Sequence, residues 1–267
     1  MGSNQVDIFG NITETISCDP DPTKWMRFVN LYCGSNKAQI YGDINLTIDG
    51  GIFENVFGGS KGSVDNPATG PDETYASNIY KITQEMINAH PELHDSDLGR
   101  GGNINLLIRG GTIGDLYGAC DINGNVEGRI TITVQFDEGS ICPQFIGNIY
   151  GGGNRTNYTP VDVSNYSSTD YPGYSPLIKV LKATVGGVSP NLPIIESTGD
   201  KHYEGNVYGG GNKGNVTSHP LVILGDKANP NSPVTIEGNV YGGGKEGIIN
   251  GNTKVIIVPS TNPSDDE

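Results

Sequence analysis

Residues 205–214 read G-N-V-Y-G-G-G-N-K-G, and the apolar–aromatic–glycine phrase at their centre occurs five times in the chain. Successive copies start 60, 33, 58 and 33 residues apart. Repetition at a fixed period is typical of one structural unit that stacks on copies of itself. We interpret 33 residues as one coil, and the longer spacings as the same coil with about 25 extra residues looped out. The copies are VFGGS from Val56, LYGAC from Leu116, IYGGG from Ile149, VYGGG from Val207 and VYGGG from Val240.

Two further pieces accompany the phrase. An alternating segment such as Ile44–Ile48 or Ile130–Val134 precedes it, and period-two alternation predicts a strand with one buried face. A short Gly/Asn-flanked piece such as 214–217 follows it, and Gly and Asn suit sharp corners. Three short strands per coil predict an all-β fold, a single-stranded parallel β-helix (β-solenoid) of about five or six coils. A multi-sheet sandwich is the alternative. If the chain forms the β-helix, the first residue of each copy should lie in one buried column: Val56, Leu116, Ile149, Val207 and Val240.

The same pattern sets the expected organisation of the chain. Residues 1–38 fit it poorly and are expected to be an N-terminal cap or an irregular first coil. Residues 39–258 form the β-helix, with loop insertions at about 61–100 and 154–176 that project from the same side. The first insertion contains a helix over 83–89 that ends before Pro91. Residues 259–267 are a flexible acidic tail.

Composition and charge exclude several classes of partner. The formal net charge is −14, which disfavours nucleic acid and acidic membrane surfaces, since both bind clustered Lys and Arg. No run of 18 apolar residues exists, so we expect no direct membrane insertion. None of the four cysteines forms a C-x-x-C pair, which argues against a zinc or thioredoxin site. Cys18 and Cys33 either form a disulfide or, as we favour, remain free buried thiols; Cys120 and Cys142 are unassigned.

The aromatic position of the phrase is the main candidate ligand-binding feature. Alternation points these rings away from the core, beside a strip of glycines, where they could stack on sugar rings. Tyrosines of the second insertion extend this candidate surface. The alternatives are a stacked ladder covered by the insertions, or rings that point inward. The candidates are Phe57, Tyr117, Tyr150, Tyr208 and Tyr241 in the column, with Tyr158 and Tyr171 in the insertion.

Other motifs do not meet the requirements of their sites. Residues 121–125 resemble a calcium loop, but Val126 and Ile132 stand where an EF-hand needs Gly and Glu. The two histidines of 90–94 do not match H-E-x-x-H. Glu54 and Asp115 lie near one phase of neighbouring coils, which a glycoside hydrolase would need, but we interpret them as chance carboxylates at a variable corner. We therefore expect no metal, no cofactor and no identifiable catalytic residue.

The phrase G-N-V-Y-G-G-G-N-x-G at 205–214, together with I-N-G-N-T-K-V-I-I-V at 249–258, resembles Gly-rich repeats of large secreted or surface proteins of anaerobic bacteria. The resemblance covers about residues 38–258. It implies a right-handed parallel β-helix, an extracellular or cell-surface location and an adhesin-like or glycan-contacting role, and it supplies no catalytic residues. The motif set of the polygalacturonase-type hydrolases (N-T-D, D-D, G-H-G, R-x-K) does not occur here.

Together these features favour a non-enzymatic binding or structural module that forms part of a larger bacterial surface protein. Its expected partner is a polysaccharide or a host or bacterial surface protein. One alternative is a polysaccharide lyase or glycoside hydrolase on the same scaffold. A further alternative is a spacer that binds no ligand.

Overall fold

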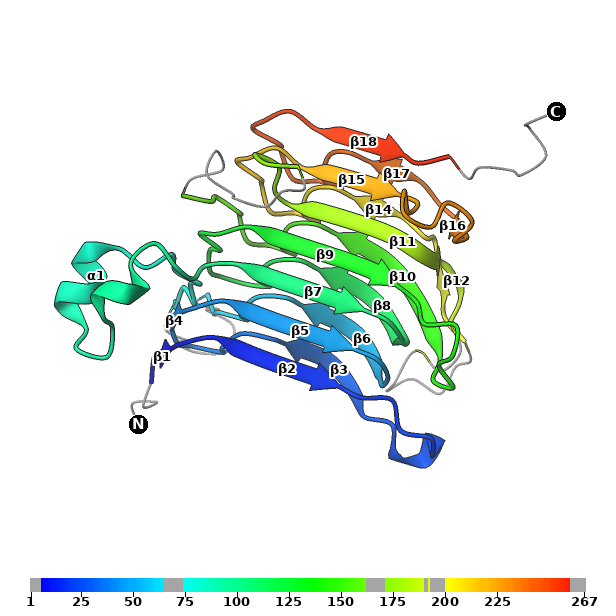
Figure 1. Ribbon diagram of the computed structural model, residues 1–267, viewed down its shortest axis with the longest axis horizontal. Helices are drawn as coiled ribbons and strands as arrows, with labels where there is room; N and C mark the ends of the chain where they lie inside the picture. The colour runs from blue at the N-terminus through cyan, green and yellow to red at the C-terminus, as the bar shows by residue number, and fades with distance from the viewer. Residues whose placement is uncertain (1–5, 65–73, 162–170, 190–191, 193–199, 260–267) are drawn as a thin grey trace.

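The computed structural model describes residues 6–64, 74–161, 171–189, 192 and 200–259. It is mostly β, with 39% strand and 5% helix, which confirms the all-β prediction. A large parallel sheet of nine strands curls into a half-barrel. The strands lie one above another from the N-terminal to the C-terminal end, and a helical excursion projects from one side (Figure 1).

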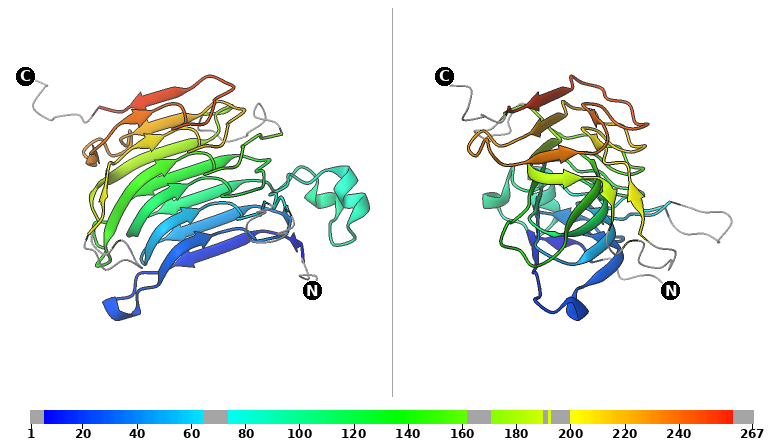
Figure 2. Two further views of the ribbon diagram at one scale, coloured as in Figure 1. Left: turned by 180° about the vertical axis from the view of Figure 1, so that it is seen from behind. Right: turned by 90° about the vertical axis from the view of Figure 1, so that its right-hand side faces the viewer.

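The strands form two rows, which face each other across the core (Figure 2). The first row contains β2 (Ile12–Ile16), β5 (Ile44–Ile48), β7 (Ile104–Ile108), β9 (Ile130–Gln135), the start of β11 (Leu177–Val185), β15 (Leu221–Leu224) and β18 (Lys254–Ile257). The second row contains β3 (Arg27–Tyr32), β6 (Ile52–Phe57), β8 (Gly111–Tyr117), β10 (Gln144–Tyr150), β14 (Val207–Tyr208) and β17 (Val240–Tyr241).

One long strand joins the two rows. The first part of β11 pairs with β9 and β15, and a register shift between Val180 and Lys182 separates it from the second part. That second part pairs with β10 and with β16 (Val234–Ile236) in the second row. This crossing makes a single curled sheet where the sequence predicts separate short strands.

A third series of contacts, the bridge row, follows the corner piece of each repeat. It contains β1 (Ile8–Phe9) paired with β4 (Ile40–Tyr41), and Ile79 bridges both Ile40 and Val126. Further along the chain, Val216 bridges Tyr158 and Ile249. Ile79 is fully buried in the main core, so the chain returns to the core within the predicted insertion at 61–100.

The predicted column of apolar residues is confirmed. Val56 pairs with Leu116, Leu116 with Ile149, Ile149 with Val207, and Val207 with Val240. The first four are completely buried and the fifth is half-buried at the last turn. Residues 8–32 contribute to the same three rows, so the N-terminal segment stacks in register with the strands that follow it.

Corner geometry explains the Gly and Asn of the repeat. A Cβ at Gly118 or Gly151 would collide with the carbonyl oxygen of the glycine one turn further on, Gly151 and Gly209 respectively. Asn side chains bind the backbone of the next turn. The Asn78 Oδ1 accepts from Asn125 N at 2.9 Å, and the Asn215 Oδ1 accepts from Ile248 N at 2.8 Å. These Asn side chains therefore bond to backbone N–H groups at the corner of the neighbouring turn, and so they hold successive corners together.

The remaining elements lie in excursions. α1 (Gln84–Ala89) begins after the Thr83 N-cap and ends before His90, which confirms the predicted helix. The short 3-10 helices are η1 (Pro22–Lys24) and η2 (Asp95–Asp97). An excursion that the sequence does not reveal carries the antiparallel pair β12 (Gly187–Val188) and β13 (His202–Tyr203), and Tyr203 and Leu192 cover the outside of the second row.

Candidate functional site

The aromatic column forms a continuous stack on the side of the second row opposite the core. Neighbouring ring centroids from Tyr32 to Tyr241 lie 4.7–5.0 Å apart, with interplanar angles of 6–12°. Phe57, Tyr117, Tyr150 and Tyr208 are buried, whereas Tyr241 at the end of the stack is 42% exposed. Each inner ring therefore presents its faces to two other rings, so the column is a stacked ladder whose rings cover one another. A sugar ring could reach an aromatic face only at an end of the ladder.

Polar groups hold one edge of this ladder. The Tyr32 hydroxyl donates to Asp121 Oδ2 at 2.9 Å, and Asn154 Nδ2 donates to Asp121 Oδ1 at 2.8 Å. Burial raises the pKa of the Tyr117 and Tyr150 phenols, and the nearby Asp115 carboxylate raises it further. Asp121, the first residue of the calcium-like loop, thus anchors the ladder through hydrogen bonds.

The two tyrosines of the second insertion do not offer open rings. Tyr158 is completely buried in the core, and its hydroxyl donates to the Gly128 carbonyl at 2.8 Å. Tyr171 is half-buried against Leu177 and Leu221, and its carbonyl accepts from Arg129. The middle of that insertion, residues 162–170, lies outside the described residues. These placements favour structural roles for Tyr158 and Tyr171.

The two candidate carboxylates lie on the outside of the second row. Asp115 lies in a row of amides between its paired neighbours Asn55 and Asn148, and the Asn148 Nδ2 donates to it at 2.8 Å. Burial raises the pKa of Asp115. The Tyr203 ring packs on Gly114 and Gly147 close to this row, and its buried hydroxyl has no hydrogen-bond partner among the residues that the structure describes.

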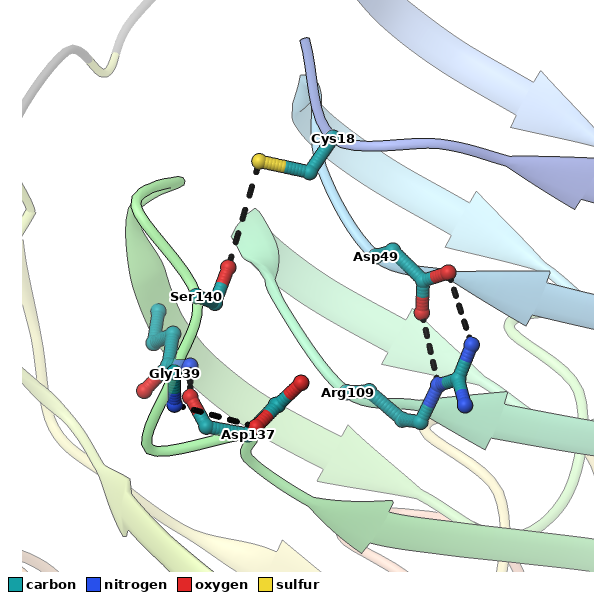
Figure 3. Close-up of polar contacts among 7 residues, drawn as sticks. Cys18, Asp49, Arg109, Asp137, Gly139 and Ser140 are labelled. Carbon is teal, nitrogen blue, oxygen red and sulfur yellow. Dashed lines mark hydrogen bonds and ion pairs between the residues drawn. The ribbon is translucent and has the colours of Figure 1, made fainter. Parts of the chain in front are cut away.

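An open polar pocket of about 390 Å³ lies where the first row turns toward the second. Figure 3 shows side chains from successive turns converging on it. Asp49 follows β5, Arg109 follows β7 and Asp137 follows β9, so the in-register stacking of these strands brings them together. Its lining residues are Ser17, Cys18, Asp49, Arg109, Asp137, Gly139, Ser140 and Ile141.

The charged groups of this pocket are prearranged. Arg109 makes a bidentate contact with Asp49, with Nε–Oδ1 at 2.7 Å and Nη2–Oδ2 at 2.8 Å. The Arg109 guanidinium donates hydrogen bonds to Asp49, and the negative charges of Asp49 and the nearby Asp137 also favour its protonated form. The pKa of Arg109 therefore lies above its ordinary value. The Arg109 side chain is nevertheless 48% exposed. The pocket therefore presents a fixed cation, carboxylate oxygens and two serines, which suits the binding of a hydroxyl-rich ligand.

A disulfide forms the rim of the pocket and corrects the expectation for the cysteines. Cys18 pairs with Cys142, 124 residues away, and not with Cys33. Cys33 and Cys120 are free and buried, and for Cys33 this confirms the favoured prediction of a free buried thiol. Burial raises the pKa of both thiols to about 12. No sequence signal identifies Cys142 as the partner of Cys18. The two residues are 124 positions apart, and only the stacking of the turns brings them together.

A smaller pocket of about 200 Å³ lies under the helical excursion, between Tyr41, Ile82 and Leu93. The Tyr41 hydroxyl lies 3.2 Å from His90 Nε2, which ties the excursion to the bridge row. His94 caps η2 and His219 accepts from Asn252 N, so these histidines serve local structure.

Among the residues that the structure describes, no group of three or more His, Cys, Asp or Glu side chains is arranged to hold a metal ion. Within the same ranges no helix has both the length and the apolarity needed to span a membrane. In comparisons with known proteins, no family model, no curated protein and no solved structure matches the chain.

Proposed function

We propose that the chain is a right-handed parallel β-helix that serves as a non-enzymatic binding or structural module of a larger, surface-exposed bacterial protein. Three observations support this proposal: the in-register rows, the bridge row and the aromatic ladder, each of which joins successive turns. Ladders of this kind fix each turn on the next and favour a rigid platform. The handedness and the surface location rest on the resemblance of the repeats.

The contact surface that the geometry favours is the polar pocket around Arg109, and no longer the aromatic column. The single observation that carries this proposal is the half-exposed Arg109–Asp49 pair held beside a disulfide in an open pocket. Bidentate charged pairs and neighbouring hydroxyls can bind the vicinal hydroxyls or the carboxylates of a polysaccharide. The expected ligand is therefore a polar glycan segment.

The experiment is a glycan-array and polysaccharide-retardation screen of the purified chain, run with a reducing-end assay on the same polymers. We expect binding without new reducing ends, weakened about tenfold or more by Arg109→Ala, which removes the charged hydrogen bonds. Arg100→Ala is the matched control, because Arg100 is an exposed arginine beside Asp97 and remote from the pocket. Equal losses in the two variants would contradict the assignment of the pocket.

One observation favours an enzyme as the second candidate. Asp115 has a raised pKa, and its charge acts on Tyr203, whose hydroxyl is unpartnered within the described ranges; both are features of a general acid site. A lyase or glycoside hydrolase would release unsaturated products or reducing ends, and Asp115→Asn would abolish them. Absence of both binding and products would leave the spacer as the function to pursue.

A further inference from the structure

The polar pocket around Arg109 has two walls with different hydrogen-bonding groups. Figure 3 shows the Asp49–Arg109 pair on one side, and Asp137 and Ser140 on the other, where they belong to the loop between β9 and β10. β5, β7 and β9 each pair with a strand on both sides. The strands that place the charged groups of the pocket are therefore inner strands of the stack.

Arg109 supplies free donors on the sheet side of the pocket. Its Nε and Nη2 atoms donate to Asp49 at 2.7 and 2.8 Å, whereas Nη1 donates to no residue within the described ranges. Because the guanidinium is a planar fork, the N–H groups that Asp49 does not use lie along the other edges of the group. The Arg109 side chain is 48% exposed, so these donors are open to an acceptor on a ligand.

Asp137 supplies a free acceptor on the loop side. Its Oδ1 accepts from Gly139 N at 3.0 Å, and its backbone N–H donates to the Arg109 carbonyl oxygen at 2.9 Å, so the residue is fixed beside Arg109. In the part of the chain that the structure describes, nothing donates to the Asp137 Oδ2 atom. The Arg109 side chain pairs with Asp49 and leaves Asp137 without an ion pair there. The pocket thus holds a free carboxylate oxygen opposite a free donor edge.

The charge balance of the pocket restricts the ligand. Among the described residues that line it, Arg109 is the only basic one and Asp49 and Asp137 are both acidic, which gives one positive and two negative charges. The whole chain carries a formal net charge of −14. A ligand carboxylate can only accept hydrogen bonds, so it would be repelled by both aspartates. A hydroxyl group both donates and accepts, so adjacent hydroxyls can satisfy Arg109 and Asp137 together.

The rim of the pocket favours an organic ring over an inorganic ion. Ile141 lines the pocket and is 66% exposed. It precedes Cys142, whose disulfide to Cys18 holds the loop against the first turn. An apolar side chain beside a few convergent polar groups is typical of small-molecule sites, and the volume of about 390 Å³ lies in their range. Ile141 therefore suits the C–H face of a sugar ring.

We propose that the pocket binds a neutral sugar residue through two adjacent hydroxyl groups, one accepting from Arg109 and the other donating to Asp137, and that Asp137 excludes uronic acids. This inference rests on the proposed function, since it names the class of glycan that the same pocket binds. Asp137 is thus a specificity-determining residue, and Arg109 contributes affinity for any glycan that enters the pocket.

The test compares pairs of soluble polysaccharide fragments that share a linkage and differ in charge: glucan with glucuronan, mannan with mannuronan, and polygalacturonate with its methyl ester. Isothermal titration calorimetry measures the affinity of the purified chain for each. We expect the neutral member of the bound pair to bind at least about tenfold more tightly than the acidic member. Asp137→Asn keeps the Oδ1 that accepts from Gly139 but removes the charge and the free acceptor. It should weaken neutral binding, strengthen acidic binding and lower this ratio by about tenfold or more.

Glu138→Gln is the matched control, because Glu138 is the next residue on the same loop, is 81% exposed, pairs with Lys182 and does not line the pocket. It should leave the ratio unchanged, and circular dichroism verifies that each variant retains its strands.

The outcomes separate this inference from the proposed function. Binding that survives Arg109→Ala, or a wild-type chain that binds no polymer of the panel, overturns both. If Arg109→Ala abolishes binding, the inference alone is overturned by a wild-type preference for the acidic member, or by equal ratios in the Asp137→Asn and Glu138→Gln variants.

Discussion

At the scale of single residues, the aromatic ladder shows how a position that alternation points outward can still be buried. The inner rings are covered by one another, and each buries both faces in the stack. Glycine follows every ring except Tyr32, and after the four buried rings the next turn leaves no space for a Cβ. Close stacking of turns therefore accounts for the repeated Tyr-Gly-Gly-Gly.

Truncation of an inner ring tests this explanation. Tyr150→Ala should lower the free energy of unfolding by about 3–5 kcal/mol, because it leaves a cavity between Tyr117 and Tyr208. Tyr241→Ala is the matched control and should cost about 1 kcal/mol, since this exposed ring loses one aromatic contact. Urea unfolding measures both. Equal effects would show that the inner rings are not stacked as described.

Buried neutral groups should make the fold sensitive to alkali. The pKa of Cys33 and of Cys120 is raised from 9.0 to about 12, and that of Tyr41 from 10.0 to about 12, with burial as the first cause. The unfolded chain therefore loses these protons first, so stability is complete below about pH 9 and falls as the pH rises toward 12. Urea unfolding at pH 8 and pH 11 should give a lower free energy at pH 11, and a smaller drop in Cys33→Ala. A free energy that is constant over this range would contradict the burial of these groups.

At the scale of elements, the sequence predicts what repeats and misses what occurs once. The buried column and the strands before each phrase follow from alternation and repetition, and the helix follows from its helix-forming residues and from Pro91. The crossing strand β11 could not be predicted, because its two parts pair with different rows although its residues look like any other strand. The excursion with β12 and β13 was hidden because the 58-residue spacing was attributed to one insertion.

The polar pocket was missed for a related reason. Asp49 and Arg109 are 60 residues apart, and only the 60-residue register of β5 and β7 joins them. A search for charged residues at the same offset after each alternating strand could have found this pair. The Cys18–Cys142 bridge follows from no such offset, since it links the loop after β2 to the loop between β9 and β10.

That disulfide holds the N-terminal turn against the turns above it. Cys18→Ser/Cys142→Ser should lower the free energy of unfolding by about 2–4 kcal/mol, because the bridge constrains a long loop in the unfolded chain. Thermal unfolding of this variant beside the oxidised wild type measures the loss. Cys33→Ser is the control for a change at a free buried thiol. A double variant as stable as the wild type would contradict a stabilising role for the bridge.

At the scale of the whole molecule, the account depends on seven first-row strands that stack in one register from β2 to β18. Such a stack is stiff along its length, as a stalk or platform requires. This regular stacking supports the proposed role as a rigid module.

The most direct test is a pulsed electron–electron distance measurement between spin labels at Thr13→Cys and Lys254→Cys. Both positions are exposed and lie in one outward column, six strand spacings apart. At about 4.8 Å per spacing, the account predicts a single narrow distribution near ~29 Å. The wild-type chain, treated with the same spin label, measures how much label reacts with the buried free thiols of Cys33 and Cys120. A broad distribution, or a maximum displaced by more than one strand spacing, would contradict the in-register stack.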